Sequence, residues 1–358
     1  MLLRLRRDWC GTRTGYCYTA RPFVANDTHA NLGPSARCFV TGAAGFLGGE
    51  LVRTVLRSGV TPDRLRCLVR NRESAIAQGV PEQSLVVGDL RDLDAVARAI
   101  DGSNLVFHLA GTIKGARRED FLPVNVDATR QLAEVIAQRT PSAFLVHVSS
   151  LAAAGPSVDG SGADRKASEC RTISAYGESK RLGELAVSQC VPRHAIVRPP
   201  VVYGPGDSAT RLLFRTATAP LCFVPPVARP ISIAHVRDVV RALLAVAAQQ
   251  PLGSTMAIEG PDRTDTHALL RAIAAVCGRR ARLVPMPLSI AAVAALACDG
   301  FARATGRLFH FNRDKVRELR SVGWVADASS LFAATGFRPS VCLRDGLREV
   351  ARAEGLAR

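Results

Sequence analysis

Four polar side chains able to bind and move protons follow one another in the middle of the chain. Ser149 and Ser150 end the apolar segment Val-His-Val-Ser-Ser, and Tyr176 and Lys180 follow in Tyr-Gly-Glu-Ser-Lys. On a helix, residues four apart share one face. A free phenol has a pKa near ~10, and a neighbouring ammonium favours its ionised form. The series predicts that Ser150 holds a carbonyl or hydroxyl, Tyr176 moves a proton and Lys180 lowers the pKa of Tyr176.

A strand, a glycine-rich turn and a helix near the start of the chain would position a ligand. Residues 38–41 predict a short buried strand, residues 50–57 continue as an amphipathic helix, and Gly42, Gly45 and Gly48 fall three apart between them. Gly42 would allow the tight turn, Gly45 would let the backbone approach a phosphate, and Gly48 would let the helix pack closely. The helix N-terminus favours negative charge. The turn predicts a dinucleotide site; an incidental glycine-rich turn is the alternative.

Strand-like and helix-like patterns alternate from residue 38 to about 196. This alternation predicts parallel βαβ units with helices on both faces of a sheet, which is a doubly wound α/β fold of the Rossmann type. After the first strand, further strands are expected at 64–69, 84–87, 104–109, 143–148 and 194–197. Helices are expected at 93–100, 126–138, 266–277 and 343–353. The strand-end serines would then lie at the sheet edge where open α/β folds bind ligands.

Together these motifs resemble the extended branch of the short-chain dehydrogenase/reductase superfamily, the NAD-dependent epimerase/dehydratase family. The signature residues are Thr-Gly-Ala-Ala-Gly-Phe-Leu-Gly at 41–48 and the Tyr-x-x-x-Lys pair. The segment Val-Ser-Ser-Leu-Ala-Ala-Ala-Gly-Pro at 148–156 is closer to the 3β-hydroxysteroid dehydrogenase-like and dihydroflavonol reductase-like members. The resemblance implies an NAD(P)-binding domain at 37–204 plus 231–250 and a smaller substrate-binding part at 205–230 plus 251–358. It also implies a homodimer.

The resemblance assigns roles to individual residues. It favours Ser150 over Ser149 as the catalytic serine, because Ser150 stands five residues before Gly155. It implies that Lys180 also holds the nicotinamide ribose, and that Asn125 stiffens the sheet and can hold a relay water. The expected cofactor-binding residues are Gly42, Gly45, Phe46, Leu47, Gly48, Arg70, Asp89, Leu90, Leu109, Ala110, Gly111, Ser149, Tyr176, Lys180, Pro199 and Val202.

The end of the second strand bears on the choice of cofactor. An acidic residue there would bind the ribose 2′-hydroxyl, but Arg70 follows the strand, and an arginine suits a 2′-phosphate. Arg72 could assist it. This favours NADP(H) over NAD(H), although Arg70 could also be a solvated residue at a strand end. The resemblance gives Asp89 a hydrogen bond to the adenine amine, whereas an Asp before a helix is usually a cap.

Two departures from nucleotide-sugar enzymes bear on the substrate. Those relatives usually carry Asn where this chain has Val201, and dehydratases carry an Asp-Glu pair where it has Leu151 and Ala152. The apolar stretches 219–227 and 283–298 could line a hydrophobic pocket, touch a membrane surface or form ordinary core. We expect a ketone reductase or secondary-alcohol dehydrogenase acting on a sterol-like or keto-lipid substrate, ketoceramide-type lipids included. A nucleotide-sugar epimerase or dehydratase and a non-catalytic cofactor-binding subunit are the alternatives.

Composition limits the other classes of function. The 358 residues carry a net charge of +16, almost all from arginine, but the arginines are scattered, which argues against nucleic-acid binding. The ten cysteines include no CxxC pair, so we expect reduced thiols, no metal site and a cytoplasmic protein, with membrane association as the alternative. No run reaches the ~20 apolar residues that span a bilayer. The arginine-rich residues 1–36 predict a disordered extension, with a transit peptide as the alternative.

Overall fold

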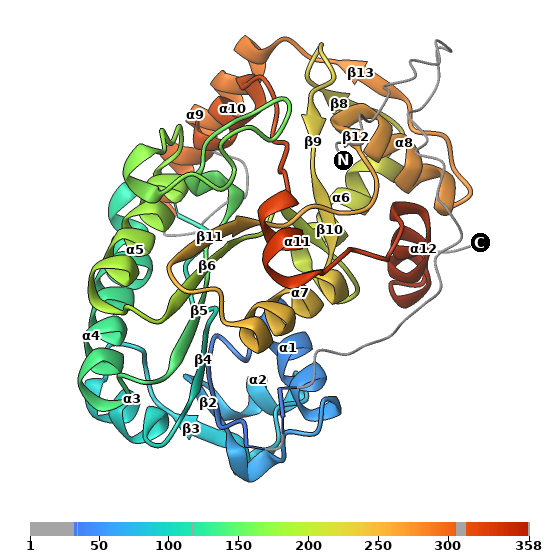
Figure 1. Ribbon diagram of the computed structural model, residues 1–358. Helices are drawn as coiled ribbons and strands as arrows, with labels where there is room; N and C mark the ends of the chain where they lie inside the picture. Colours follow the sequence, from blue (N-terminus) through green and yellow to red (C-terminus); the bar gives the residue numbers. More distant parts are fainter. Residues whose placement is uncertain (1–31, 34, 116, 306–312, 357–358) are drawn as a thin grey trace, which may run out of the picture.

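The computed structural model describes residues 32–33, 35–115, 117–305 and 313–356 (Figure 1). The extension expected at 1–36 therefore lies mostly outside the described residues. Ala36 is buried and Leu32 packs against the main core, so the folded part begins a few residues before the first strand.

The fold is built on a seven-stranded sheet in which every neighbouring pair is parallel (Figure 1). Its strands are rich in Val, Leu, Ile and Phe, as expected for strands covered on both faces. The order β11-β6-β5-β4-β1-β2-β3 reverses direction between β1 and β4, which creates the switch point where such sheets bind ligands. The strands are β1 (Cys38–Thr41), β2 (Leu65–Val69), β3 (Leu85–Val87), β4 (Leu105–His108), β5 (Phe144–Val148), β6 (His194–Arg198) and β11 (Ser254–Ala257).

Helices cover both faces of this sheet (Figure 1). Each layer has its own apolar core, because alternate side chains of a strand point to opposite faces. The layer on one face comprises α1 (Phe46–Arg57), α2 (Arg72–Ala77), α7 (Val236–Gln249) and α11 (Ser329–Thr335). The layer on the other face comprises α3 (Leu93–Ile100), α4 (Thr129–Arg139) and α5 (Ala175–Cys190).

A smaller part packs beyond the carboxyl ends of the strands. It has a separate apolar core formed by α6 (Ser208–Thr218), α8 (Thr266–Val276), α12 (Leu343–Ala353), β8 (Cys222–Val224) and β13 (Leu283–Pro285). This part of the chain also forms three two-stranded sheets. They pair β7 (Val201–Tyr203) with β10 (Ile233–His235), β9 (Pro230–Ile231) with β12 (Thr264–Asp265), and β8 with β13. Helices α9 (Leu288–Thr305) and α10 (Arg313–Arg320) pack on each other at one end of the molecule (Figure 1).

Most of the expected elements are confirmed to within one residue at each end. Helix α1 begins at Phe46, four residues before the expected start, because Gly45 is its N-cap. The helix expected at 126–138 is preceded by a π-helical turn over Pro123–Ala128. The predicted domain boundary at residue 250, which places β11 in the smaller part, is wrong for this strand. This strand pairs with β6, Met256 opposite Val197, and completes the main sheet.

Candidate active site

The glycine-rich turn between β1 and α1 has the geometry expected for a pyrophosphate site. Gly42 has φ +77°, and a Cβ there would lie 2.7 Å from the backbone nitrogen of Ala110. A Cβ on Gly48 would overlap the carbonyl oxygen of Gly42, so neither position accepts a larger residue. Gly45 caps α1 with no side-chain hydrogen bond, and the first turn holds no acidic residue. The free N–H groups and the helix dipole therefore suit a phosphate, and these residues fit a dinucleotide.

The end of β4 lies directly beside this turn. The backbone nitrogens of Leu109 and Ala110 donate to the carbonyl and hydroxyl oxygens of Thr41, each at 3.2 Å. Gly111 follows, where a Cβ would lie 3.1 Å from Oδ1 of Asn125. The switch point thus brings together backbone from β1 and β4, and Leu109, Ala110 and Gly111 border the glycine turn.

Tyr176 and Ser150 meet where α5 packs on the short turn that follows β5. Ser150 caps that turn, its Oγ accepting from the nitrogen of Ala152 at 3.2 Å. Tyr176 lies in the first turn of α5, which Ser174 caps by accepting from the Gly177 nitrogen at 3.2 Å. A Cβ on Gly177 would overlap the carbonyl oxygen of Ala152, so the helix and the turn are in close contact. This packing brings the phenol of Tyr176 close enough to the side chain of Ser150 for that side chain to favour the ionised phenol and lower its pKa.

The ionisation of Tyr176 differs from the sequence-based expectation. Burial raises the pKa of its phenol to about 12, the side chain of Ser150 opposes this, and the nearby carboxylate of Glu318 adds to it. Lys180 is not among the groups that shift the pKa of Tyr176, and its buried Nζ donates to the carbonyl oxygen of Val148 at 2.9 Å. Burial also lowers the pKa of Lys180 to about 8. At neutral pH Tyr176 is therefore a protonated phenol, able to give up a proton.

Asn125 connects the site to the helix layer. The residue is buried in the π-helical turn, and its Nδ2 donates to the carbonyl of Thr112 and to Oγ of Ser179, both at 2.9 Å. Its Oδ1 accepts from the nitrogen of Thr112 at 2.7 Å. All of its polar atoms are engaged, so Asn125 fixes the segment after β4 against the helix that carries Tyr176.

The remaining residues expected near the nicotinamide lie at the ends of β5 and β6. The hydroxyl of Ser149 is buried and has no hydrogen-bond partner among the described residues, although its nitrogen donates to the carbonyl of Val197 at 2.8 Å. The carbonyl of Pro199 accepts from the nitrogen of Leu151 at 2.8 Å. Val202 follows in β7 and packs against the main core. A buried hydroxyl without a partner is unusual, and a ligand could supply one.

The residues expected at the adenosine end lie after β2 and β3. Arg70 is exposed directly after β2, while Arg72 forms an ion pair with Glu82. Asp89 is paired with Arg91, with Nε 2.7 Å from Oδ1; these hydrogen bonds, with a smaller effect of Arg70, lower the pKa of Asp89 below its usual range. The side chain of Leu90 is buried in the core formed with α3, α4 and α5. Arg70 is thus an exposed cation at the end of β2, whereas Asp89 already has a partner.

Several contacts around Tyr176 have no local signal in the sequence. The ring of Phe121 lies 5.9 Å from the ring of Tyr176, between centroids. Oδ2 of Asp314, in α10, accepts from the nitrogen of Ala175 at 2.7 Å and so caps α5 from a distance of 139 residues. Arg118 binds both carboxylate oxygens of Glu178 at 3.0 Å. Only the packed structure brings these groups to the catalytic helix.

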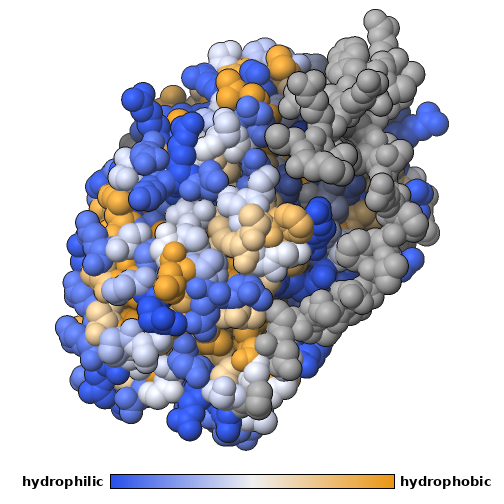
Figure 2. Space-filling model, in the orientation of Figure 1, coloured by the Kyte–Doolittle hydropathy of each residue, from blue (hydrophilic) through white to orange (hydrophobic). Residues whose placement is uncertain are grey.

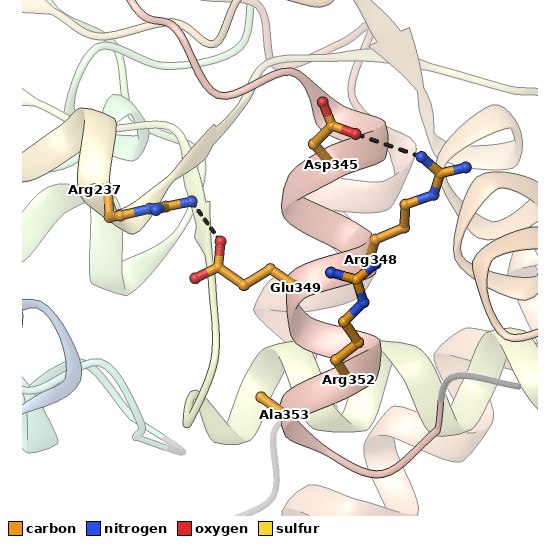
Figure 3. Close-up of a pocket in the computed structure, with 6 residues that line it drawn as sticks. All are labelled: Arg237, Asp345, Arg348, Glu349, Arg352 and Ala353. Atoms are coloured by element: carbon orange, nitrogen blue, oxygen red, sulfur yellow. Dashed lines mark hydrogen bonds and ion pairs between the residues drawn. The ribbon is translucent and has the colours of Figure 1, made fainter. Parts of the chain in front are cut away.

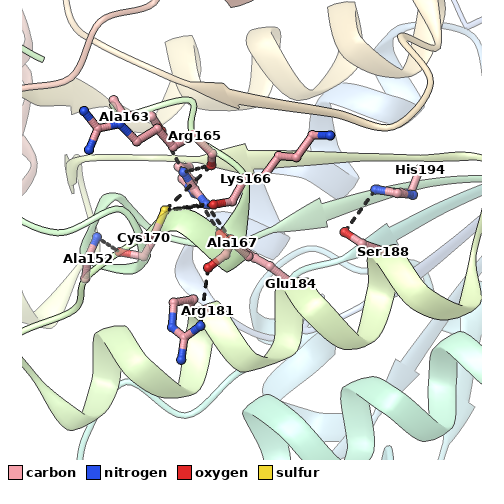
Figure 4. Close-up of polar contacts among 12 residues, drawn as sticks. Ala152, Ala163, Arg165, Lys166, Ala167, Cys170, Arg181, Glu184, Ser188 and His194 are labelled. Atoms are coloured by element: carbon pink, nitrogen blue, oxygen red, sulfur yellow. Dashed lines mark hydrogen bonds and ion pairs between the residues drawn. The ribbon is translucent and has the colours of Figure 1, made fainter. Parts of the chain in front are cut away.

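A fully buried ion pair holds the loop between β5 and α5. Arg198, the last residue of β6, donates to Glu184 through Nε at 2.8 Å and Nη2 at 2.6 Å, and both side chains are inaccessible to water. Its Nη1 also donates to the carbonyls of Ala163 and Arg165, at 3.0 and 2.8 Å. Figure 4 shows these loop residues, with Cys170, converging toward Glu184. These contacts of Arg198 connect β6, α5 and the loop between β5 and α5.

An open hollow lies elsewhere, along α12 (Figure 3). It has a volume of about 640 Å³ and is lined by Arg237, Asp345, Arg348, Glu349, Arg352 and Ala353. Its charges are largely paired within it: Arg237 with Glu349, and Arg348 with Asp345 at 3.6 Å. The hollow contains none of the expected site residues.

Two features are absent from the described part of the chain. No group of three or more His, Cys, Asp or Glu side chains there could hold a metal ion. No helix within those residues is long and apolar enough to cross a membrane.

The fold and this arrangement define a Rossmann-type NAD-dependent enzyme of the extended short-chain dehydrogenase/reductase class. The model of the NAD dependent epimerase/dehydratase family matches residues 38–258, and the chain belongs to this family. The resemblance drawn from the glycine turn and the Tyr-x-x-x-Lys pair is thereby confirmed.

Relatives and solved structures agree with this assignment. The chain is 34% identical over 312 residues to the ceramide reductase of Caulobacter vibrioides, covering 86% of this chain and 90% of the relative. It is 31% identical to sterol demethylase protein B of Methylococcus capsulatus, over 49% of this chain and 55% of that protein. In structure it resembles a dTDP-glucose 4,6-dehydratase, DesIV from Streptomyces venezuelae with NAD and TYD bound (TM-score 0.70, 20% identity, 89% and 97% of the two chains). That identity supports the fold alone.

Proposed function

We propose that this protein is an NAD(P)-dependent reductase of a ketone, or dehydrogenase of a secondary alcohol, on a hydrophobic lipid of keto-lipid, ketoceramide or sterol type. The observation that carries the proposal is the close packing of the first turn of α5, which holds Tyr176, on the turn that Ser150 caps at the carboxyl end of β5. The relation to a ceramide reductase over most of both chains supports the lipid class. The nucleotide-sugar alternative rests on structures that share only the fold.

Each residue of the candidate site would have a separate role in the reaction. The bound cofactor would supply or accept the hydride. The turn at Gly42 and Gly45 would hold its pyrophosphate through backbone N–H groups and the α1 dipole. Ser150 would hydrogen-bond the substrate oxygen, and Tyr176, protonated at neutral pH, would donate a proton to that oxygen during reduction. Lys180 would hold the ribose hydroxyls and return a proton to Tyr176.

Replacement of Tyr176 tests the proposed acid. Tyr176→Phe removes the donated proton while keeping the ring contact with Phe121, so turnover should fall by roughly 10²–10⁴-fold with cofactor affinity nearly unchanged. The measurements are NADPH oxidation with a panel of keto-lipids and keto-steroids, and cofactor fluorescence titration. Tyr203→Phe is the matched control, because Tyr203 is a buried tyrosine of the smaller core. Unchanged turnover in Tyr176→Phe would contradict the assignment.

The cofactor preference is tested separately at Arg70. We propose NADP(H) as the preferred cofactor, because Arg70 is exposed after β2 while Asp89 is engaged by Arg91. Arg70→Glu should weaken NADPH binding far more than NADH binding, and Arg57→Glu, an exposed change of the same charge at the end of α1, should affect neither. Equal loss of both cofactors in Arg70→Glu would remove the ribose-phosphate argument.

Lipid profiling of a deletion strain tests the substrate class. An accumulated long-chain ketone would support the proposal and name the substrate. Altered surface polysaccharide with unchanged lipids would instead favour a nucleotide-sugar substrate.

A further inference from the structure

The orientation of helix α9 is the reverse of that usual for a surface helix. Its large apolar side chains face solvent: Ile290, Val293, Leu296 and Phe301 are 55%, 68%, 53% and 51% exposed. The residues it buries are small: Ala291 is 2% and Ala295 0% exposed. A surface helix normally turns its large apolar residues to the core.

The four exposed residues form one continuous face. At 100° per residue, Ile290, Val293, Leu296 and Phe301 lie within an arc of about 140°. Between Leu288 and Phe301 the helix has one charged residue, Asp299, which lies on the buried side and accepts from Nε of Arg313 at 3.2 Å. The exposed arc of that segment therefore carries no charge. Contiguous apolar surface of this kind marks an interaction site. We name these four residues the α9 face.

Further apolar side chains lie at the same end of the molecule. Leu221 and Phe223, before and within β8, are 53% and 56% exposed, and Phe223 is in register with Val284 of β13, which leads into α9. Figure 1 places β8, β13, α9 and α10 at this end, and the space-filling view shows apolar side chains gathered there (Figure 2).

The surroundings of the α9 face are positively charged. Helix α10, which packs on α9 through Val316, exposes Arg313, Lys315, Arg317 and Arg320. The first three form ion pairs with Asp299, Glu318 and Asp314 respectively, and all four cations remain exposed at the surface. Arg282, next to Cys222 in the β8–β13 pair, is also exposed. With a net charge of +16 for the chain, an apolar face bordered by cations is complementary to an anionic lipid surface. A second copy of the chain would bring like charges together instead.

The α9 face is also linked to the catalytic helix. Val316 of α10 packs against Ala291 and Ala295, and the preceding turn of α10 caps α5 through Asp314. Glu318 raises the pKa of Tyr176. Helix α10 therefore contacts both α9 and the start of the helix that carries Tyr176.

We propose that the α9 face docks on the surface of an anionic phospholipid bilayer, with Ile290, Val293, Leu296 and Phe301 seated at the boundary between headgroups and acyl chains. The cations of α10 would contact the lipid phosphates. This inference concerns where the protein binds and does not depend on the reaction proposed above.

Vesicle sedimentation with the full chain tests the proposal. Vesicles of phosphatidylglycerol and phosphatidylcholine (3:7) are compared with pure phosphatidylcholine, and wild type with Ile290→Ser/Val293→Ser/Leu296→Ser. We expect binding to the anionic vesicles, weakened by salt, with a partition coefficient at least ten-fold lower in the triple variant. Leu252→Ser, at an exposed leucine between α7 and β11, is the matched control and should bind like wild type.

Three outcomes would overturn the proposal. The triple variant could bind the anionic vesicles as well as wild type does, which would assign binding to charge elsewhere. Wild type could fail to bind them at all. Gel filtration could show a dimer of the wild type that the triple variant dissociates, which would make the face an interface between copies. Thermal melts confirm that the variants are folded, and cofactor titration reports on the Rossmann domain independently.

Discussion

At the residue scale, the glycine turn is the part of the site that the sequence constrains most tightly. Gly42 needs a positive φ, and Gly48 needs the absence of a side chain, because a Cβ would overlap the carbonyl of Gly42. That carbonyl belongs to the backbone and cannot move aside without displacing the start of α1. The geometry of the turn therefore requires glycine at both positions.

Gly48→Ala should therefore destabilise the fold and weaken cofactor binding. Overpacking of this kind costs roughly 1–3 kcal/mol in the free energy of unfolding. Gly300→Ala is the matched control, because a Cβ at this helical position meets nothing within 4 Å. The control should gain about 0.5–1 kcal/mol from helix propensity. Urea melts and NADPH titration measure both effects; equal stability of the two variants would contradict the close contact.

The ionisation of Tyr176 and Lys180 could not be predicted from residue types and spacing. The spacing of Tyr176 and Lys180 correctly predicts that both lie on one helix, but the lysine donates to Val148, a residue of β5. The pKa of Tyr176 depends on burial and on Glu318, which lies 142 positions later in the chain. The members of the site stay a prediction from residue types and spacing, whereas their electrostatics depend on tertiary packing, which spacing does not reveal.

At the element scale, the Arg198–Glu184 pair joins β6 to α5. Two fully buried charges are stable only when each is well paired, and Arg198 also satisfies two carbonyls of the preceding loop. The pair fixes where α5 lies relative to the strand edge. It therefore positions the catalytic helix without touching the expected site residues.

Glu184→Gln should be strongly destabilising, because it leaves the guanidinium of Arg198 buried without a counter-charge. Breaking a buried pair costs about 3–5 kcal/mol. Asp101→Asn is the control: Asp101 lies 3.7 Å from Arg139 and both are more than half exposed, so the change should cost about 0–1 kcal/mol. Urea denaturation compares them. A loss below about 1 kcal/mol in Glu184→Gln would show that the pair is not needed.

The elements themselves were predictable where local pattern decides them. Strand β1 and helices α3 and α12 have the expected ends, since apolar periodicity and caps define them. Strand β11 was missed as part of the main sheet because its short segment, Ser-Thr-Met-Ala, takes its role from pairing with β6. The cap that Asp314 places on α5 likewise requires contact between distant segments.

At the scale of the whole molecule, burial lowers the pKa of four histidines among the described residues, and the effect is largest for His108, His147 and His235. His108, in β4, contacts the hydroxyls of Thr41 and Thr129 at 2.7 and 2.9 Å, and burial lowers its pKa to about 3. Its neighbour His147 has no hydrogen-bond partner for either ring nitrogen among the described residues, and burial places its pKa well below the ordinary value. Burial, helped by Arg237, lowers the pKa of His235 to about 4.

These histidines predict a loss of stability in mild acid. The unfolded chain takes up a proton on each near pH ~6.5. In the folded protein the pKa is about 3 for His108, about 4 for His235 and well below the ordinary value for His147. Because the folded pKa values are depressed, their stabilising effect is complete above pH ~6.5 and is lost progressively below it. Each histidine should lower the free energy of unfolding by up to about 1.4 kcal/mol per pH unit. Urea melts between pH 7.5 and 5 measure the slope, above the range where paired carboxylates titrate.

His147→Leu isolates one of these contributions. It removes two ring nitrogens that have no partner in the described part of the chain. In place of the imidazole it puts an apolar side chain of similar size in β5. The slope between pH 6 and 5 should therefore become shallower by about 1.4 kcal/mol per pH unit, with little loss of stability at pH 7.5. A slope equal to that of the wild type would mean that His147 takes up its proton in the folded state. The acid sensitivity would then have to come from His108, His194, His235 and the surface.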